Sequence, residues 1–289
     1  MPSGTLFVVA TPLGNLSDIT PRALDTLKRA AIVACEDTRR TRGLLSHFGI
    51  RAPRVISCHK FNEKRQLDTV LAALREGKDV ALVSDGGTPG LSDPGAVAVE
   101  AALNEGLPVS PIPGPSAVAA ALSVCGFEGS SFVFAGFLPS RAGERRRAIE
   151  ALRGETRVIV LFEAPHRVAA TVAGLAETLG DRPVTLLREI TKMHEEVRRT
   201  SLVELSEALR ASPPRGEFTL VVAGRPEGAE IGAVAEKMTG DQLRRRYGEL
   251  LDAGIDRREA LKSLVREAGL SRKVVYDAVR TGDRLAPED

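Results

Sequence analysis

Short apolar runs alternate with longer amphipathic stretches over most of this chain, up to about residue 225. The runs Leu6–Ala10, Asp79–Val83 and Pro108–Ile112 are rich in aliphatic residues, and each is followed by a turn that contains Gly or Pro. Strands that alternate with helices at this spacing are typical of a mostly parallel sheet. The chain is therefore predicted to be an α/β protein.

The predicted elements form two groups, separated by a Gly-rich stretch around residues 126–136. In the first group we expect strands at Leu6–Ala10, Ala31–Cys35, Asp79–Val83 and Pro108–Ile112, and helices at Pro21–Ala31, Asn62–Glu76, Ala96–Glu105 and Ala117–Val124. In the second group we expect strands at Val158–Glu163, Val184–Arg188 and Phe218–Ala223, and helices at Arg167–Leu179 and Leu202–Arg210. Two α/β domains are therefore placed at residues 1–118 and 119–226.

Only helices are expected after a linker at residues 225–228. Their predicted ranges are Thr239–Ala253, Asp256–Ala268 and Ser271–Thr281. Residues 269–279 resemble the turn and last helix of a helix-turn-helix. We therefore predict a third domain at residues 232–289, a small helical module of the helix-turn-helix type.

The net charge of +2 does not indicate a polyanionic partner, but the basic residues are clustered. Eight Lys or Arg and a single acid, Glu63, lie from Arg39 to Arg65, and four arginines lie at positions 141 and 145–147. From Arg244 to Lys273, nine basic residues and five acids give a net charge of +4. Such patches either bind a phosphate backbone or form a solvated surface, and the sequence leaves both open.

The three cysteines are widely spaced and form no CxxC pair, so neither a disulfide framework nor a zinc site is predicted. His194 and Glu195 begin a zinc-protease pattern, but Arg198 stands where the second His would be. The first apolar run is too short for a signal peptide or a membrane segment. We expect a cytoplasmic protein without a bound metal and without membrane contact.

Residues 84–95, with the sequence SDGGTPGLSDPG, are the most informative stretch for function. Six of these twelve positions are Gly or Pro, and the stretch directly follows a predicted strand. Glycine permits unusual backbone dihedrals and close approach of a ligand, and open α/β sheets bind ligands at the carboxyl ends of strands. A loop that binds a nucleoside through its backbone is therefore favoured over a plain surface loop.

Two further turns, TPLGN at 11–15 and PGPSA at 113–117, also follow predicted strands. Ser116 can cap the helix that follows, donate to a ligand, or do both. No GxGxxG follows the first strand and no GxxxxGK[ST] occurs. These absences disfavour an ordinary dinucleotide-binding fold and a P-loop NTPase.

Seven blocks, in order along the chain, resemble the small-subunit ribosomal RNA methyltransferase I family of the tetrapyrrole methylase superfamily. They are TPLGNL (11–16), EDTRRT (36–41), SDGGTPGLSDPG (84–95), PGPSA (113–117), GFLP (136–139), EAPHR (163–167) and REITKMHEE (188–196). The resemblance covers nearly the whole chain. Gly86 is a small departure, because the family usually has Ala there.

The resemblance implies a homodimer whose chain has two α/β domains of the tetrapyrrole methylase type, with S-adenosylmethionine bound in the cleft between them. It also implies 2′-O-methylation of a cytidine in the decoding region of 16S rRNA, which makes the small ribosomal subunit the partner. The matching positions that would line the cofactor are Pro12, Gly86, Gly87, Thr88, Leu91, Ser116, Ala117 and Phe162, with parts of Phe218–Ala223 nearby.

A ribose hydroxyl is weakly acidic, so a nearby group is expected to accept its proton during methyl transfer. The candidates are Asp37, Glu163 and His166, followed by Glu189, Lys192 and Glu195. Structural roles stay open for each; for example, Asp37 can pair with Arg39 or Arg40. The predicted RNA contacts are Arg39, Arg40, Arg145, Arg146, Arg272 and Lys273.

Two other functions remain as alternatives. A methyltransferase acting on a tetrapyrrole, such as a precorrin or uroporphyrinogen, would explain the fold and the Gly/Pro turns. It would not explain the basic patch from Arg39 to Arg65 or the C-terminal helices. A non-catalytic nucleic-acid-binding protein would explain the basic patches but not three turns crowded with Gly and Pro.

Overall fold

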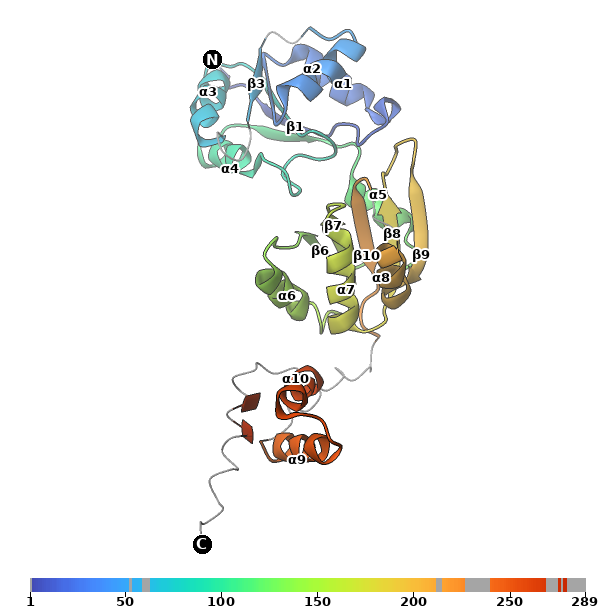
Figure 1. Cartoon of the computed structure of the whole chain (residues 1–289). Helices are drawn as coiled ribbons and strands as arrows, with labels where there is room; N and C mark the ends of the chain where they lie inside the picture. Colours follow the sequence, from blue (N-terminus) through green and yellow to red (C-terminus); the bar gives the residue numbers. More distant parts are fainter. Residues whose placement is uncertain are drawn as a thin grey trace. The chain divides into compact units, whose positions relative to one another are not determined.

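The computed structural model describes residues 2–51, 54–58, 63–211, 215–226, 240–268, 275–276 and 278–279. The chain divides into two compact units, Met1–Arg225 and Pro226–Asp289. The first unit contains both sheets of the described residues, and the second contains helices (Figure 1). None of the described helices is both long enough and apolar enough to cross a membrane.

The first sheet has five strands in the order β3-β2-β4-β1-β5, and all of its described pairs are parallel. The strands are β1 (Leu6–Val9), β2 (Ile32–Cys35), β3 (Val55–Ser57), β4 (Val80–Val83) and β5 (Val109–Ile112). In the register of this sheet, Val9 lies beside both Val83 and Ile112. The turns after β1, β4 and β5 therefore leave the same edge of the sheet.

Helices cover both faces of the first sheet because its strands are apolar on both sides. The helices α3 (Glu63–Arg75) and α4 (Ala96–Asn104) pack on one face, where Leu82 is buried. The helices α1 (Pro21–Arg29) and α2 (Thr38–His47) pack on the other face, where Val83 is buried. Thr20 caps α1 by accepting a hydrogen bond from the backbone N–H of Ala23.

The second sheet has the order β6-β7-β10-β8-β9, and it is mixed. Its strands are β6 (Phe132–Phe137), β7 (Val158–Glu163), β8 (Pro183–Arg188), β9 (Glu196–Ser201) and β10 (Phe218–Val222). Only the pair of β6 with β7 is parallel; the three other pairs are antiparallel. Glu163 at the end of β7 lies opposite Phe218 at the start of β10, which brings these two ends together.

Four helices complete the first unit. The helices α6 (Ala142–Ala151), α7 (Val168–Leu179) and α8 (Leu202–Ala211) contribute to the core on one face of the second sheet. Helix α5 (Ala117–Val124) packs on the opposite face, where Val118 joins Val160 and Val221. The chain therefore crosses from the first sheet to the second at the turn that precedes α5. The domain boundary at residue 118 stays a prediction.

The second unit contains α9 (Gly240–Asp252) and α10 (Arg257–Ala268). Their buried core includes Leu243, Leu250, Leu264 and Val275. Asp256 caps α10, because its carboxylate accepts hydrogen bonds from two backbone N–H groups of the first turn. Most of the predicted helix Ser271–Thr281 lies outside the described residues.

Five elements were not predicted from the sequence: α2, β3, β6, α6 and β9. Helix α2 has three arginines and a glycine within ten residues, and β9 is a polar edge strand, so neither shows an apolar period. Strand β6 contains an irregularity between Phe134 and Gly136, and it overlaps the Gly-rich stretch that separates the two groups of predicted elements. The prediction of a mostly parallel sheet is confirmed for the first sheet, and the mixed second sheet was not foreseen.

Candidate functional site

Three turns at one edge of the first sheet form one side of the site. We call them the first, second and third bends; they are residues 11–15, 84–95 and 113–117. The backbones of Thr11 and Gly87 exchange two hydrogen bonds of 2.9 Å, which join the first bend to the second. The hydroxyl of Thr88 donates to the carbonyl of Pro115 at 3.3 Å, which joins the second bend to the third. The bends are therefore one hydrogen-bonded group.

The second bend follows a course that few residues can adopt. Gly87, which pairs with Thr11, has a φ of +89°, a region that favours glycine. Ser92 lies in the same left-handed region, with a φ of +68°, although it has a Cβ. Such a conformation is uncommon outside glycine and persists only where the surroundings impose it. The bend is therefore held in a defined shape.

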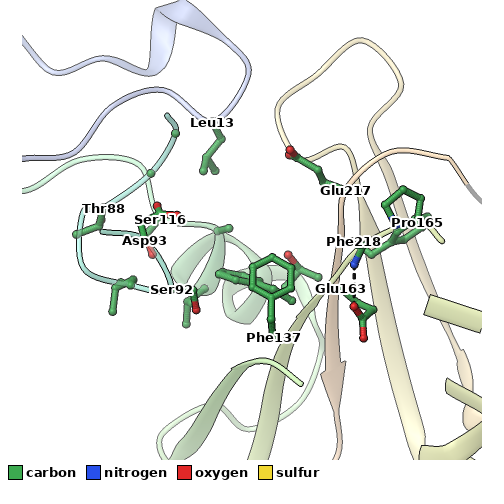
Figure 2. Close-up of a pocket in the computed structure, with 18 residues that line it drawn as sticks. Leu13, Thr88, Ser92, Asp93, Ser116, Phe137, Glu163, Pro165, Glu217 and Phe218 are labelled. Carbon is green, nitrogen blue, oxygen red and sulfur yellow. Dashed lines mark hydrogen bonds between the residues drawn. The ribbon is translucent and has the colours of Figure 1, made fainter. Parts of the chain in front are cut away.

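The bends and the facing ends of β6, β7 and β10 enclose a cavity of about 420 Å³ (Figure 2). Its lining includes seven of the eight residues predicted to bind the cofactor: Gly86, Gly87, Thr88, Leu91, Ser116, Ala117 and Phe162. Ser116 also caps α5, accepting a hydrogen bond from the N–H of Ala119 at 3.4 Å. The structure thus brings these residues together, and their role as cofactor contacts stays a prediction.

Aromatic rings form part of the wall that the second sheet contributes. Phe162 packs against Phe134 with ring centroids 5.0 Å apart, and against Phe137 at 5.7 Å. Phe137 is 53% exposed and lines the cavity, so its ring is available to a planar ligand group. Sequence reasoning missed Phe137 because it did not detect strand β6.

Two carboxylates that the sequence did not single out, Asp93 and Glu217, also line the cavity (Figure 2). The pKa of Asp93 is raised to about 6, first by burial and also by the charges of Glu36, Asp85 and Glu217, although a hydrogen bond with Ser84 lowers it. Negative charges at close range disfavour ionisation, and a bound cation reverses that effect. The cavity is therefore matched electrostatically to a positively charged ligand.

This lining fits the methyl donor that the resemblance implies. A nucleoside offers a flat base to side chains such as Phe137 and polar edges to exposed backbone such as that of Gly86–Thr88. A sulfonium and an ammonium carry positive charge, which the carboxylates of Asp93 and Glu217 attract. The volume and the chemistry of the cavity both suit S-adenosylmethionine.

A second cavity of about 270 Å³, which we call the adjoining hollow, shares Leu13 with the first. The first bend, the start of the second bend and helix α2 line it, and Pro12, the eighth predicted cofactor residue, lies here. Arg40 of α2 lies in its wall with Nε 3.6 Å from Asp85 Oδ2, and the arginine side chain is 67% exposed. Such a solvated pair is weak, so the guanidinium can exchange its partner for a phosphate.

Glu163 lines the cavity, but its carboxylate is held by protein groups. Its Oε1 accepts from the backbone N–H of Ala164 at 2.9 Å (dashed in Figure 2), and its Oε2 accepts from the hydroxyl of Thr171 at 2.6 Å. Arg167 forms an ion pair with it at 3.2 Å, and the carboxylate side chain is fully buried. These contacts support a structural role, and the predicted role as proton acceptor is untested.

Asp37 is the N-cap of α2. Its side chain accepts from the side chain and the backbone N–H of Arg39, and these hydrogen bonds lower the pKa of Asp37 to about 2. A carboxylate with this pKa is a weak base at neutral pH. Asp37 does not belong to the lining of the cavity or of the adjoining hollow.

The other predicted residues lie around the site or beyond the described part of the chain. His166 is exposed in the turn before α7 and does not line the cavity. Arg39 is exposed and pairs with Asp37, and Arg145 and Arg146 lie on α6. Arg272 and Lys273 lie outside the described residues.

Comparison with known proteins gives consistent matches. Residues 5–206 match the family described as Tetrapyrrole (Corrin/Porphyrin) Methylases. Two relatives named ribosomal RNA small subunit methyltransferase I come from Micromonospora olivasterospora (45% identical, over 96% of this chain and 87% of that one) and Synechocystis (42%, over 94% and 96%). A third, from Thermotoga maritima, is 46% identical over 222 residues, which cover 77% of this chain and 99% of the relative.

Solved structures share the fold at lower identity. A uroporphyrin-III-C-methyltransferase from Thermus thermophilus has a TM-score of 0.54 and 23% identity, over 76% of this chain and 94% of that one. A cobalt precorrin-4 methyltransferase has a TM-score of 0.57 and 21% identity, over 76% and 94%. A diphthine synthase has a TM-score of 0.59 and 18% identity, over 76% and 90%. At these identities the likeness concerns the fold alone.

Proposed function

The chain belongs to the tetrapyrrole methylase family, the family of its ribosomal RNA small subunit methyltransferase I relatives, and we propose that it methylates small-subunit ribosomal RNA. The methyl donor is S-adenosylmethionine. The acceptor that we propose is the ribose 2′-hydroxyl of a cytidine in the decoding region of 16S rRNA. Identity above 40% over almost the whole chain supports this substrate class over a tetrapyrrole.

The observation that carries the proposal is the meeting of three hydrogen-bonded bends at one cavity. Backbone groups at Gly86–Thr88 would bind the polar edges of the nucleoside, and Phe137 and Phe162 would contact its flat faces. Asp93 and Glu217 would attract its positive charges. When bound, the cofactor supplies a methyl group on a positively charged sulfur, ready for displacement by an oxygen.

The protein itself positions the cofactor and the acceptor. Because the bends are fixed by the contacts of Thr11 and Thr88, the cofactor is held without reorganisation during the reaction. The adjoining hollow lies beside the cavity and has Arg40 in its wall, so we assign it to the target nucleotide and its phosphate. As proton acceptors, Asp37, Glu163 and His166 stay predictions.

Two basic regions are proposed to bind the RNA backbone. One consists of arginines of the first unit: Arg39 and Arg40 on α2, where Arg40 lines the adjoining hollow, and Arg145 and Arg146 on α6. The other is the helical unit, whose sequence includes Arg272 and Lys273 and which we interpret as an additional RNA-binding surface.

We further propose a cytoplasmic homodimer that acts on the small ribosomal subunit. The functional domains would be residues 1–118, 119–226 and 232–289. The first two would share the cofactor, because the chain crosses from one sheet to the other at the third bend.

The proposal is tested by incubating the protein with S-adenosylmethionine that carries a labelled methyl group and with either 30S subunits or uroporphyrinogen. We expect label in the 16S rRNA and none in the tetrapyrrole. Label in uroporphyrinogen alone would replace the proposed substrate, whereas binding of the cofactor without transfer to either acceptor would refute both choices.

A further inference from the structure

The segment Arg188–Glu196, between β8 and β9, places a lysine at the border of the two cavities. Lys192 Nζ lies 2.9 Å from Oε2 of Glu217, which lines the cofactor cavity. The stem of Lys192 lies over Gly14, which lines the adjoining hollow: a Cβ on Gly14 would collide with Lys192 Cγ. Lys192 therefore contacts a lining residue of each cavity.

The backbone around Lys192 is held in an unfavourable shape. Glu189 and Thr191 have φ angles of +52° and +65°, in the left-handed region, and Thr191 is β-branched. Non-glycine residues adopt this region rarely, and β-branched ones are outliers there. Strain of this kind persists only where surrounding contacts impose it, and it is concentrated at functional sites.

The ammonium is oriented by two carboxylates from different parts of the chain. Oε1 of Glu189 accepts from Lys192 Nζ at 3.0 Å and from the backbone N–H of Glu217 at 2.8 Å, so it fixes both partners. An ammonium has three N–H groups, and the described residues account for two of them. Burial lowers the pKa of Lys192, but the hydrogen bonds that its ammonium donates to Glu217 and Glu189 outweigh this effect and raise the pKa overall. Lys192 is thus a permanent cation and hydrogen-bond donor, unsuited to act as a base.

We propose that Lys192 is a catalytic residue whose ammonium donates a hydrogen bond to the oxygen that receives the methyl group. In the reaction, this oxygen attacks the methyl carbon, and an O–C bond forms as the C–S bond breaks. The electron pair of the broken bond stays on sulfur, and the hydroxyl proton leaves to water. Negative charge grows on the attacking oxygen as its proton leaves, and a fixed ammonium stabilises that charge. The inference rests on the proposed RNA methyltransferase function.

The test compares Lys192→Met, Lys192→Arg and the matched control Lys78→Met, which removes an exposed lysine paired with Glu76. Each variant is assayed for methyl transfer to 30S subunits, for S-adenosylmethionine binding by calorimetry and for thermal unfolding. For Lys192→Met we expect kcat about 100-fold lower, with KM for subunits and Kd for the cofactor within about threefold of the parent. Lys192→Arg should recover about tenfold of this loss because it restores a donor cation, and Lys78→Met should match the parent.

Three results would overturn the inference in distinguishable ways. A kcat for Lys192→Met within about threefold of the parent would show that the ammonium is dispensable for transfer. Loss of cofactor binding or of thermal stability in Lys192→Met, in parallel with activity, would assign the lysine a purely structural role. If the parent protein binds the cofactor but methylates no RNA, the proposed function is refuted, and the inference about Lys192 is refuted with it.

Discussion

At the scale of single residues, Asp93 shows how the cavity can select charge. Its carboxyl group is half-buried, and the acids that face it are Glu36, Asp85 and Glu217. Because its pKa is raised in the folded protein, the carboxylate of Asp93 binds a proton more tightly there than in the unfolded chain. Asp93 therefore favours folding below its unfolded pKa, and this contribution is lost as pH rises through about 6.

Binding of a cationic cofactor should show the opposite pH dependence, because it requires ionised Asp93. With a pKa of about 6, roughly a tenth of this carboxyl is ionised at pH 5. We expect S-adenosylmethionine to bind about tenfold more weakly at pH 5 than at pH 7.5, as measured by calorimetry. S-adenosylhomocysteine, which lacks the sulfonium charge, should show a smaller change. An unaltered pH dependence in Asp93→Asn would contradict this assignment.

Glu163 offers a second prediction at this scale. Its buried carboxylate accepts from Thr171 and the backbone of Ala164 and pairs with Arg167, so Glu163→Ala leaves the partly buried guanidinium without its carboxylate partner. We expect the free energy of unfolding in urea to fall by about 3 kcal/mol. The control Thr171→Val removes one hydrogen bond and should cost about 1 kcal/mol. A fully stable Glu163→Gln protein without methyl transfer would instead favour the predicted role as proton acceptor.

Residue types alone revealed the bends but not the charges around them. Six Gly or Pro residues within the second bend restrict its backbone, and this local property is visible in sequence. The raised pKa of Asp93 depends on Glu36 and Glu217, which are far from it along the chain. Local sequence patterns do not predict contacts between such distant residues. The roles of Asp93 and Glu217 and the orientation of Lys192 could therefore be recognised only from the fold.

At the scale of elements, helix α2 forms a wall of the adjoining hollow, and a residue of this wall can be substituted without disturbing the core. Gly43 lies within α2 and lines the hollow, and a Cβ added there meets no atom within 4 Å. A Cβ therefore has room at this position without disturbing the packed core, which makes Gly43 a test of what the hollow binds.

We expect Gly43→Trp to raise KM for 30S subunits about tenfold, because an indole would occupy space assigned to the target nucleotide. Cofactor affinity should stay within about twofold of the parent, since Gly43 does not line the cofactor cavity. The matched control Gly43→Ala should keep full activity and gain up to about 1 kcal/mol of helix stability. Equal activity of the Trp and Ala variants would show that the target nucleotide binds elsewhere.

Elements with a regular apolar pattern were predicted, and those stabilised by context were not. Strand β7 was predicted at its observed bounds, Val158–Glu163. Its residues face the cores on the two sides of the sheet in alternation, so the strand is a continuous apolar run that is visible in the sequence. Strand β9 has exposed arginines and pairs only with β8 among the described strands, so its sequence carries no apolar alternation. The antiparallel pairs of the second sheet likewise depend on tertiary pairing, and the spacing of strands does not encode them.

At the scale of the whole molecule, the cofactor cavity and the helical unit belong to separate compact units. All lining residues of the cavity come from the first unit, whereas a net charge of +4 lies between Arg244 and Lys273. This separation predicts that cofactor binding and RNA affinity can be altered independently.

Deletion of residues 229–289 should leave S-adenosylmethionine affinity unchanged and weaken binding to 30S subunits about tenfold, because phosphate contacts are lost. The slope of log K against log salt should also become shallower in the truncated protein. Calorimetry and filter binding at several salt concentrations measure the two effects. Equal subunit affinity and equal salt slopes would remove the helical unit from RNA recognition.

The central claim, transfer of a methyl group from the cavity to a ribose hydroxyl, is tested most directly by identifying the labelled nucleoside. Small subunits or 16S rRNA are methylated with labelled S-adenosylmethionine, digested to nucleosides and analysed by mass spectrometry. The account predicts a single labelled product, 2′-O-methylcytidine, which is absent when the cofactor is omitted. Label on a nucleobase, or RNA that stays unlabelled while the cofactor binds, would contradict it.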